Sequence, residues 1–171
     1  MLDSGPEIIA LGPAHVRPLF AFYQSLTPAV TSLFLPFGHI TEIAIRAHLE
    51  AVSAGAHLSY GLADAPGAIH GHAFLLDNQA DEPIFGIGVD ESYQGRGHGR
   101  ELMRRVLSEA DGQGISTTIL TVVKHNHRAI RLYETMGYIR TGEATFRTRY
   151  DSWSMTRLRP TAPAAGRTSP S

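Results

Sequence analysis

The sequence predicts a mixed α/β fold of the α+β type, in which a mostly antiparallel sheet of about seven strands is flanked by about four helices. Two observations lead to this prediction. Segments with strand-like and helix-like apolar periods follow one another in the order β-α-α-β-β-β-α-β-α-β-β. The three consecutive strands in the middle are joined by short, turn-rich segments, which favours antiparallel neighbours. The strict alternation of a doubly wound sheet is therefore excluded.

Each element has a local sequence signal. Strands are expected where β-branched and apolar residues lie between turn residues, over residues 7–11, 57–63, 68–76, 84–90 and 116–123, with further strands in 138–158 that turn near Asp151–Ser152. Helices are expected where apolar residues recur at helical spacing, over 14–26, 41–53, 97–111 and 127–136. Thr41 and Asn126 are placed as helix N-caps. The segment Thr27–His39 contains two prolines and is interpreted as a loop that packs on the core or lines a pocket.

Length and composition set the broad class. The 171 residues have room for one ordinary domain, which we expect over residues 1–158. The Pro/Ala/Ser-rich tail at 159–171 has little apolar bulk and is expected to be disordered. The sequence has no cysteine, which excludes disulfides, thiolate metal sites and a cysteine nucleophile. No early basic segment and no apolar run of about 18–20 residues is present, so we expect a cytoplasmic protein with no membrane association.

Charge is distributed unevenly along the chain. The net charge is −1, which gives no general argument for nucleic acid, and no nucleic-acid partner is expected. Residues 1–90 hold 9 acidic and 2 basic side chains, whereas residues 91–171 hold 7 acidic and 13 basic ones. The basic half could face an anionic ligand and the acidic half a cationic one. A chance distribution of charged side chains over the solvent-exposed surface explains the asymmetry equally well.

A glycine-rich segment joins the strand at 84–90 to the following helix. Glycines at 95, 97 and 99 allow backbone N–H groups to converge on an anion at the positive end of the helix dipole. Arg96 and Arg100 add positive charge beside that point, and a diphosphate suits this chemistry. The dinucleotide pattern GxGxxG and the P-loop pattern GxxxxGK[ST] are both absent. Taken alone, the segment is also compatible with a purely structural glycine turn.

Two sequence motifs, one after the other along the chain, resemble those of the GNAT superfamily of acyl-CoA N-acyltransferases. The first is Val89-Asp-Glu-Ser-Tyr-Gln-Gly-Arg-Gly-His-Gly-Arg-Glu-Leu-Met103, which is similar to that family's acetyl-CoA pyrophosphate motif. The second is Asn126-His-Arg-Ala-Ile-Arg-Leu-Tyr-Glu-Thr-Met-Gly-Tyr138, which matches the family signature N-x-x-A-x-x-L-Y-x-x-x-G-[FY] and starts 29 positions after Gly97. The similarity is clear over about residues 84–140 and extends by element order over 7–158.

The resemblance implies an acyl-CoA N-acyltransferase-like fold and an N-acetyltransferase. Acetyl-CoA would be the co-substrate, no metal would be needed, and the acetyl group would pass directly to a small-molecule or peptide amine in a ternary complex. The residues implied in CoA binding are Ile87, Gly88, Val89, Gln94, Gly95, Arg96, Gly97, His98, Gly99, Arg100 and Asn126. Within this set, the backbone N–H of Val89 would polarise the thioester carbonyl and Asn126 would contact the pantetheine arm. Tyr133 would be the general acid beside the CoA sulfur. A homodimer is compatible with the sequence, which does not determine the oligomeric state.

The general base is left open. Protein N-terminal acetyltransferases of this superfamily often carry Glu five residues before the motif asparagine, where this chain has Thr121, which cannot serve. Glu82, His72 and His125 are candidates by location, and a water chain is another. His70 and His72 could pair on one strand face as metal ligands, but no third ligand is evident, so no metal is expected.

Two alternatives to the enzyme are kept. Because Thr121 replaces the expected acid, a catalytically silent acyl-CoA-binding sensor or partner module is compatible with the sequence. A generic nucleotide-binding domain is a third interpretation, against which the missing phosphate-loop patterns argue. If the family layout holds, the acceptor would lie between Thr27–His39 and the final hairpin. The acidic side chains of the first half, including Glu42 and Glu50, weakly favour a cationic amine.

Overall fold

The structure is a computed structural model that describes residues 5–34, 39–144 and 150–161. Its strands are β1 Glu7–Ala10, β2 Leu58–Ala63, β3 Ile69–Leu76, β4 Ile84–Val89, β5 Thr117–Val123, β6 Ile139–Glu143 and β7 Ser152–Leu158. Its α-helices are α1 Val16–Ser25, α2 Pro28–Thr31, α3 Glu42–Ser53, α4 His98–Gly112 and α5 His127–Thr135. Two short 3-10 turns, η1 Pro13–His15 and η2 Glu91–Tyr93, precede α1 and follow β4.

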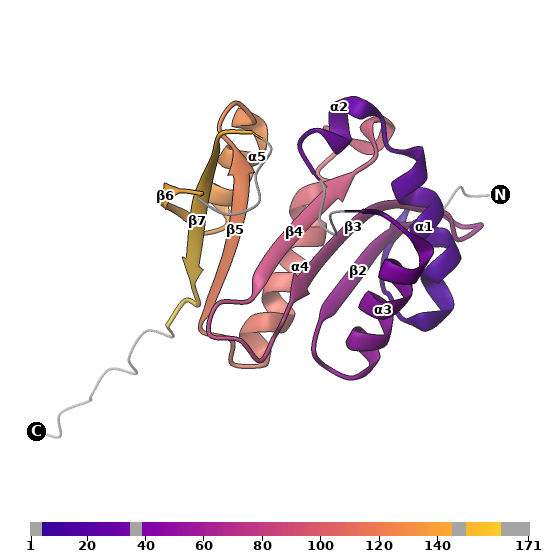
Figure 1. Cartoon of the computed structure of the whole chain (residues 1–171), viewed down its shortest axis with the longest axis horizontal. Helices are drawn as coiled ribbons and strands as arrows, with labels where there is room; N and C mark the ends of the chain where they lie inside the picture. Colours follow the sequence, from indigo (N-terminus) through magenta and orange to yellow (C-terminus); the bar gives the residue numbers. More distant parts are fainter. Residues whose placement is uncertain (1–4, 35–38, 145–149, 162–171) are drawn as a thin grey trace, which may run out of the picture.

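The seven strands form one sheet in the order β1-β2-β3-β4-β5-β7-β6 (Figure 1). Every neighbouring pair is antiparallel except β4 and β5, which run parallel in the middle of the sheet. A parallel pair needs a crossover, and here α4 supplies it. The buried face of α4 packs with α5 on one side of the sheet, whereas α1 and α3 form a second apolar cluster on the other side. The predicted mixed, mostly antiparallel sheet is confirmed.

The elements agree with the sequence patterns except at two points. Thr41 caps α3, and its hydroxyl accepts a hydrogen bond from the Ala44 N–H, as the cap pattern predicts. The segment expected to be a loop contains α2, a single turn that Pro28 opens at its first position. Of the dipeptide where the sequence placed the turn, Asp151 ends the connection between β6 and β7, whereas Ser152 already belongs to β7. Residues 159–161 lack regular structure, and the rest of the expected tail lies outside the described residues.

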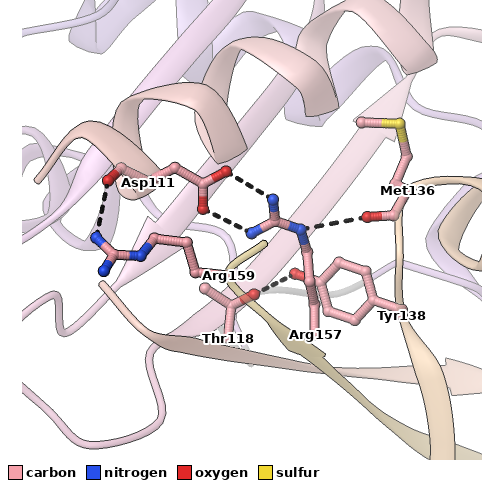
Figure 2. A network of polar contacts seen from close by, with 6 residues as sticks. All are labelled: Asp111, Thr118, Met136, Tyr138, Arg157 and Arg159. Carbon is pink, nitrogen blue, oxygen red and sulfur yellow. Dashed lines mark hydrogen bonds and ion pairs between the residues drawn. The ribbon is translucent and has the colours of Figure 1, made fainter. Parts of the chain in front are cut away.

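A polar clamp formed by Arg157 and Asp111 joins the end of α4 to strand β7 (Figure 2). The guanidinium of Arg157, on β7, donates two hydrogen bonds of 2.8 and 2.7 Å to the Asp111 carboxylate near the end of α4, and its Nε donates to the Met136 carbonyl. Beside it, the hydroxyls of Thr118 and Tyr138 lie 2.7 Å apart. Arg157 is only 7% exposed, so these charge-assisted hydrogen bonds form largely away from water. They hold β7 against α4, and β5 is held through its pairing with β7.

None of the helices in the described part of the chain combines the length and the apolar character of a membrane-spanning segment.

Candidate active site

A cavity of about 490 Å³ opens where β4 and β5 separate. The two strands share one aligned pair, Ile84 with Ile119, at the start of β4, and Figure 1 shows them diverging beyond it. The diverging strands form two walls, the glycine segment and the first turn of α4 form one end, and α2 and α5 complete the enclosure. A cavity of this size lies within the usual range for small-molecule sites.

The divergence leaves backbone N–H groups of β4 directed at the cavity. The Asp90 N–H donates to the His70 carbonyl on β3, so the even-numbered residues of β4 pair with β3. Alternate residues of a strand point their N–H groups in opposite directions. The N–H groups of Ile87 and Val89 therefore face β5, beyond the last aligned pair of the described residues. Such fixed dipoles can stabilise negative charge that develops on a bound carbonyl oxygen.

The glycine segment makes an open cradle at the start of α4. Gly95 and Gly97 have φ of +78° and +88°, a region that residues with a Cβ enter only with strain. A Cβ at Gly97 would meet nothing within 4 Å, so space rather than packing lies on that side. The N–H groups of the first turn of α4 precede the ladder, which starts with the Glu101 N–H donating to the Gly97 carbonyl. These residues fit a diphosphate.

A side-chain bridge links the two sequence motifs across one end of the cavity. Gln94 donates from Nε2 to the Val89 carbonyl at 2.9 Å, and its Oε1 accepts from Arg128 Nη1 at 3.1 Å. Arg128 lies in the first turn of α5, two residues after the cap. The bridge fixes the glycine segment relative to α5 and brings a second guanidinium, besides that of Arg100, to the cavity lining.

Asn126 and Tyr133 line the cavity from α5. Asn126 is the N-cap, and its Oδ1 accepts from the Ala129 N–H at 3.3 Å. Tyr133 is 8% exposed, and its ring packs near Phe85 and Tyr138. Burial raises the pKa of the Tyr133 phenol well above its ordinary value. The phenol is therefore neutral at physiological pH and can donate a hydrogen bond into the cavity.

The remaining wall is apolar and comes from the segment around α2. Ala29, Val30, Leu33 and Phe34 line the cavity opposite α5. An ideal Cβ at Gly88 would lie 2.4 Å from the Phe34 ring, so glycine at that position lets the ring rest on the β4 backbone. Of the final hairpin, no described residue lines the cavity, and residues 35–38 and 145–149 of the two expected acceptor segments lie outside the described part.

The sequence motifs single out ten of the 22 residues that line this cavity. Ten of the twelve residues that the motifs single out line the cavity; Arg96 and His98 lie beside it, against Tyr93. The lining residues that the motifs do not single out include Arg128, Glu91 and the apolar wall. Arg128 stands inside the second motif, so its place in the first turn of α5 was a usable signal. The apolar residues of the wall have no period that would reveal their role.

None of the three candidate bases lines the cavity in the described structure. Glu82 lies just before β4, near the end of the strand opposite Val89, and His125 lies near Tyr150. His72 is fully buried behind β4, with both ring nitrogens within hydrogen-bonding distance of hydroxyls. His70 faces Asp64 at 2.8 Å and stacks on Tyr93, so the two strand histidines have separate partners.

The suggested acidic acceptor residues also lie elsewhere. Glu42 pairs with Arg46 one turn along α3, and Glu50 is exposed on the same helix. Among the described lining residues, Glu91 is the acidic side chain, and it accepts a hydrogen bond from Thr27 at 3.3 Å.

Comparison with known proteins identifies the family. A family model described as "Acetyltransferase (GNAT) family" matches residues 23–138. The chain belongs to this family. It is 40% identical over 67 residues to the [ribosomal protein bS18]-alanine N-acetyltransferase of Escherichia coli strain K12. That stretch covers 39% of this chain and 43% of that protein, so the chain matches less than half of this curated relative.

Solved GNAT structures share the fold. The ribosomal-protein-S5-alanine acetyltransferase from Vibrio fischeri superposes with a TM-score of 0.77 at 12% identity, covering 91% of this chain and 94% of that chain. The spermidine N-acetyltransferase from Vibrio cholerae, in complex with CoA and spermine, superposes with a TM-score of 0.71 at 20% identity, covering 91% and 96%. The acyl-CoA N-acyltransferase-like fold expected from the motifs is thereby confirmed.

Proposed function

We propose that this protein is an N-acetyltransferase that binds acetyl-CoA in the cavity between β4 and β5 and transfers the acetyl group directly to an amine. The observation that carries the proposal is the divergence of β4 from β5, which joins inward-facing backbone N–H groups to a glycine cradle at one end and to Tyr133 on the opposite wall. Membership of the GNAT family supports this assignment. The acyl group arrives already activated as a thioester when acetyl-CoA is bound.

The two ends of the cavity have different tasks in this proposal. The N–H groups of residues 95–100, with Arg100 and Arg128 nearby, hold the diphosphate through charge and the helix dipole. The N–H groups of Ile87 and Val89 donate to the thioester carbonyl and stabilise negative charge on its oxygen. Asn126 lies between these points and contacts the connecting arm.

Tyr133 acts on the leaving group. Its phenol is held neutral by burial and donates a hydrogen bond to the sulfur as negative charge develops there. A thiol has an ordinary pKa of about 8.5, lower than that of this phenol, so complete proton transfer to the thiolate is uphill. Hydrogen-bond donation is therefore the larger part of the contribution from Tyr133.

The acceptor amine needs to lose a proton, since an alkylamine with a pKa of about 10 is mostly protonated at pH 7. The wall formed by Ala29, Val30, Leu33 and Phe34 favours an acceptor that presents an apolar group beside the amine. Both peptide N-termini and small amines meet this condition, and relatives with each kind of acceptor in their names are similar to this chain.

Turnover with a panel of amines tests the proposal. The protein is incubated with acetyl-CoA and peptides bearing free N-termini, diamines or polyamines, and both free CoA and acetylated product are quantified. We expect CoA release that depends on one class of acceptor and equals the amount of acetylated product formed. Acetyl-CoA binding without acceptor-dependent CoA release would instead favour a silent acyl-CoA-binding module, the alternative that Thr121 on the cavity wall keeps open.

A further inference from the structure

Five buried or half-buried side chains from four parts of the fold form one continuous hydrogen-bonded chain behind the cavity wall. The Tyr23 hydroxyl lies 2.6 Å from His72 Nδ1, and His72 Nε2 lies 2.8 Å from Ser59 Oγ. The same Oγ lies 3.1 Å from His48 Nε2, and the Nδ1 atoms of His48 and His57 lie 3.0 Å apart. At the outer end, His57 Nε2 is 3.5 Å from the carboxylate of Asp77, which is 69% exposed.

The carboxylate at the outer end favours one direction for the bonds in this chain. An ionised carboxylate only accepts, which favours the tautomer of His57 that holds its hydrogen on Nε2 and accepts at Nδ1. His48 then donates from Nδ1 and accepts at Nε2 from the Ser59 hydroxyl. Ser59 in turn accepts from His72 Nε2, which leaves His72 Nδ1 to accept from the Tyr23 hydroxyl. Each group donates toward Asp77, and the phenol oxygen stands at the head of the series.

The head of the chain lies directly behind the acceptor side of the cavity. His72 is paired in register with Gly88 of β4, a cavity residue. The ring of Tyr23 stacks on Phe34 with centroids 6.0 Å apart, and Phe34 covers Gly88. Tyr23 thus packs against a ring that itself lines the cavity. The other end reaches solvent where β2 begins and β3 ends.

We propose that this chain is a proton relay that removes the proton from the acceptor amine and delivers it to solvent at Asp77; the inference rests on the proposed acetyl transfer. The amine releases a proton through one water molecule at the edge of Phe34 to the Tyr23 oxygen, and the phenol passes its own hydrogen to His72 Nδ1. Each following group takes a hydrogen on its acceptor atom and releases one from its donor atom. One proton enters and one leaves, and each histidine then carries its hydrogen on the opposite ring nitrogen. Exchange of these hydrogens with solvent water restores the starting tautomers before the next passage.

The buried histidines suit passage rather than storage of a proton. Burial lowers the pKa of His48 to about 3, with a further contribution from His57, and burial likewise places the pKa of His72 well below its ordinary value. Both rings are therefore neutral at pH 7 and exchange one hydrogen for another. The ionisable groups that face one another here are Tyr23 from α1, His48 from α3 and His72 from β3, followed by the half-buried His57 and the exposed Asp77.

Interrupting the relay at two places tests it. Tyr23→Phe removes the head of the chain, and Ser59→Ala breaks its middle. Their matched controls are Tyr138→Phe and Thr118→Val, which break a buried hydroxyl pair of the same kind outside the chain and outside the cavity lining. The turnover number kcat is measured from pH 6 to 10 at saturating acetyl-CoA, and thermal unfolding is followed for all four variants.

We expect both relay variants to lose roughly tenfold in kcat at pH 7. The loss should shrink as the pH nears the amine pKa of about 10, where about half of the amine is already neutral. The double relay variant should be no slower than the slower single variant, because both interrupt one path. A loss that is equal at all pH values, or that the controls share, would show a structural role only and overturn the relay.

A second readout does not depend on turnover. Nitrogen chemical shifts of the imidazole rings report the tautomer of each histidine. The relay requires hydrogen on Nδ1 of His48 and on Nε2 of His57 and His72 near pH 7; the opposite tautomer at any one of them would break the direction of transfer and refute it. If these tautomers are found but no amine is acetylated, the proposed function fails while the ordered chain stands.

Discussion

Replacing Tyr133 by phenylalanine removes one hydroxyl from the cavity and tests whether this hydroxyl donates a hydrogen bond to the leaving sulfur. The side chain is 8% exposed, so a hydrogen bond to an anionic sulfur forms there away from bulk water. A hydrogen bond to a charged group contributes about 1.5–3 kcal/mol. Lost only in the transition state, this corresponds to a fall in kcat of roughly 10- to 150-fold with acetyl-CoA affinity nearly unchanged.

The assay compares kcat and acetyl-CoA affinity of Tyr133→Phe with those of Tyr138→Phe. The two rings are neighbours, with centroids 6.1 Å apart, but the Tyr138 hydroxyl faces Thr118 and does not line the cavity. Because burial raises the pKa of Tyr133, its phenol is protonated throughout pH 6–9, and the ratio of the two rates should not vary with pH. An unchanged kcat, or an equal loss in Tyr138→Phe, would reduce Tyr133 to a packing residue.

Three further predictions concern stability and binding. Asp111→Asn removes the charge that faces the buried Arg157 and should lower the free energy of unfolding by about 3 kcal/mol, or the Tm by about 6–12 °C; an unchanged Tm would show that the clamp of Figure 2 contributes little. Gly97→Ala forces a side chain into φ of +88° and should weaken acetyl-CoA binding about tenfold by calorimetry, whereas Gly142→Ala, with open space around it and no positive φ, should bind normally. Burial depresses the pKa of folded-state His48 to about 3, so its contribution to stability is complete above about pH 6.5 and is lost as the pH falls toward 3. Chemical denaturation should therefore show on the order of 2 kcal/mol less stability at pH 5 than at pH 7 from this group. Equal stability at the two pH values would contradict the buried, neutral state of His48.

Local patterns explain what could be predicted from the sequence. The strand before Val89, the glycines with positive φ and the helix that follows are specified by neighbouring residues, so the cradle was foreseen in detail. The Asn126 cap and the inward side of α5 follow in the same way from helical spacing. Matching these motifs to a known family then gave the type of fold, which no single segment encodes, whereas the order of the strands in the sheet came from the structure.

Long-range contacts explain what could not be predicted. His72 reads as an ordinary strand residue, yet its main partner, Tyr23, is 49 positions away on α1. The apolar residues around α2 form a cavity wall only because glycine at position 88 admits the ring of Phe34, a fit that depends on the folded arrangement. The acidic first half suggested Glu42 and Glu50 as acceptor contacts, but α3 carries both away from the cavity lining. Charge counted along a chain does not tell which face will carry it.

Thermal unfolding measured with and without ligand tests most directly whether the cavity between β4 and β5 binds acetyl-CoA. With a Kd near 10 µM, about 1 mM acetyl-CoA would add roughly 2.7 kcal/mol to the free energy of unfolding and raise the Tm by about 5–11 °C. We expect that shift with acetyl-CoA and a much smaller one with equal concentrations of ATP or NAD. No shift with acetyl-CoA, or an equal shift with ATP or NAD, would contradict it.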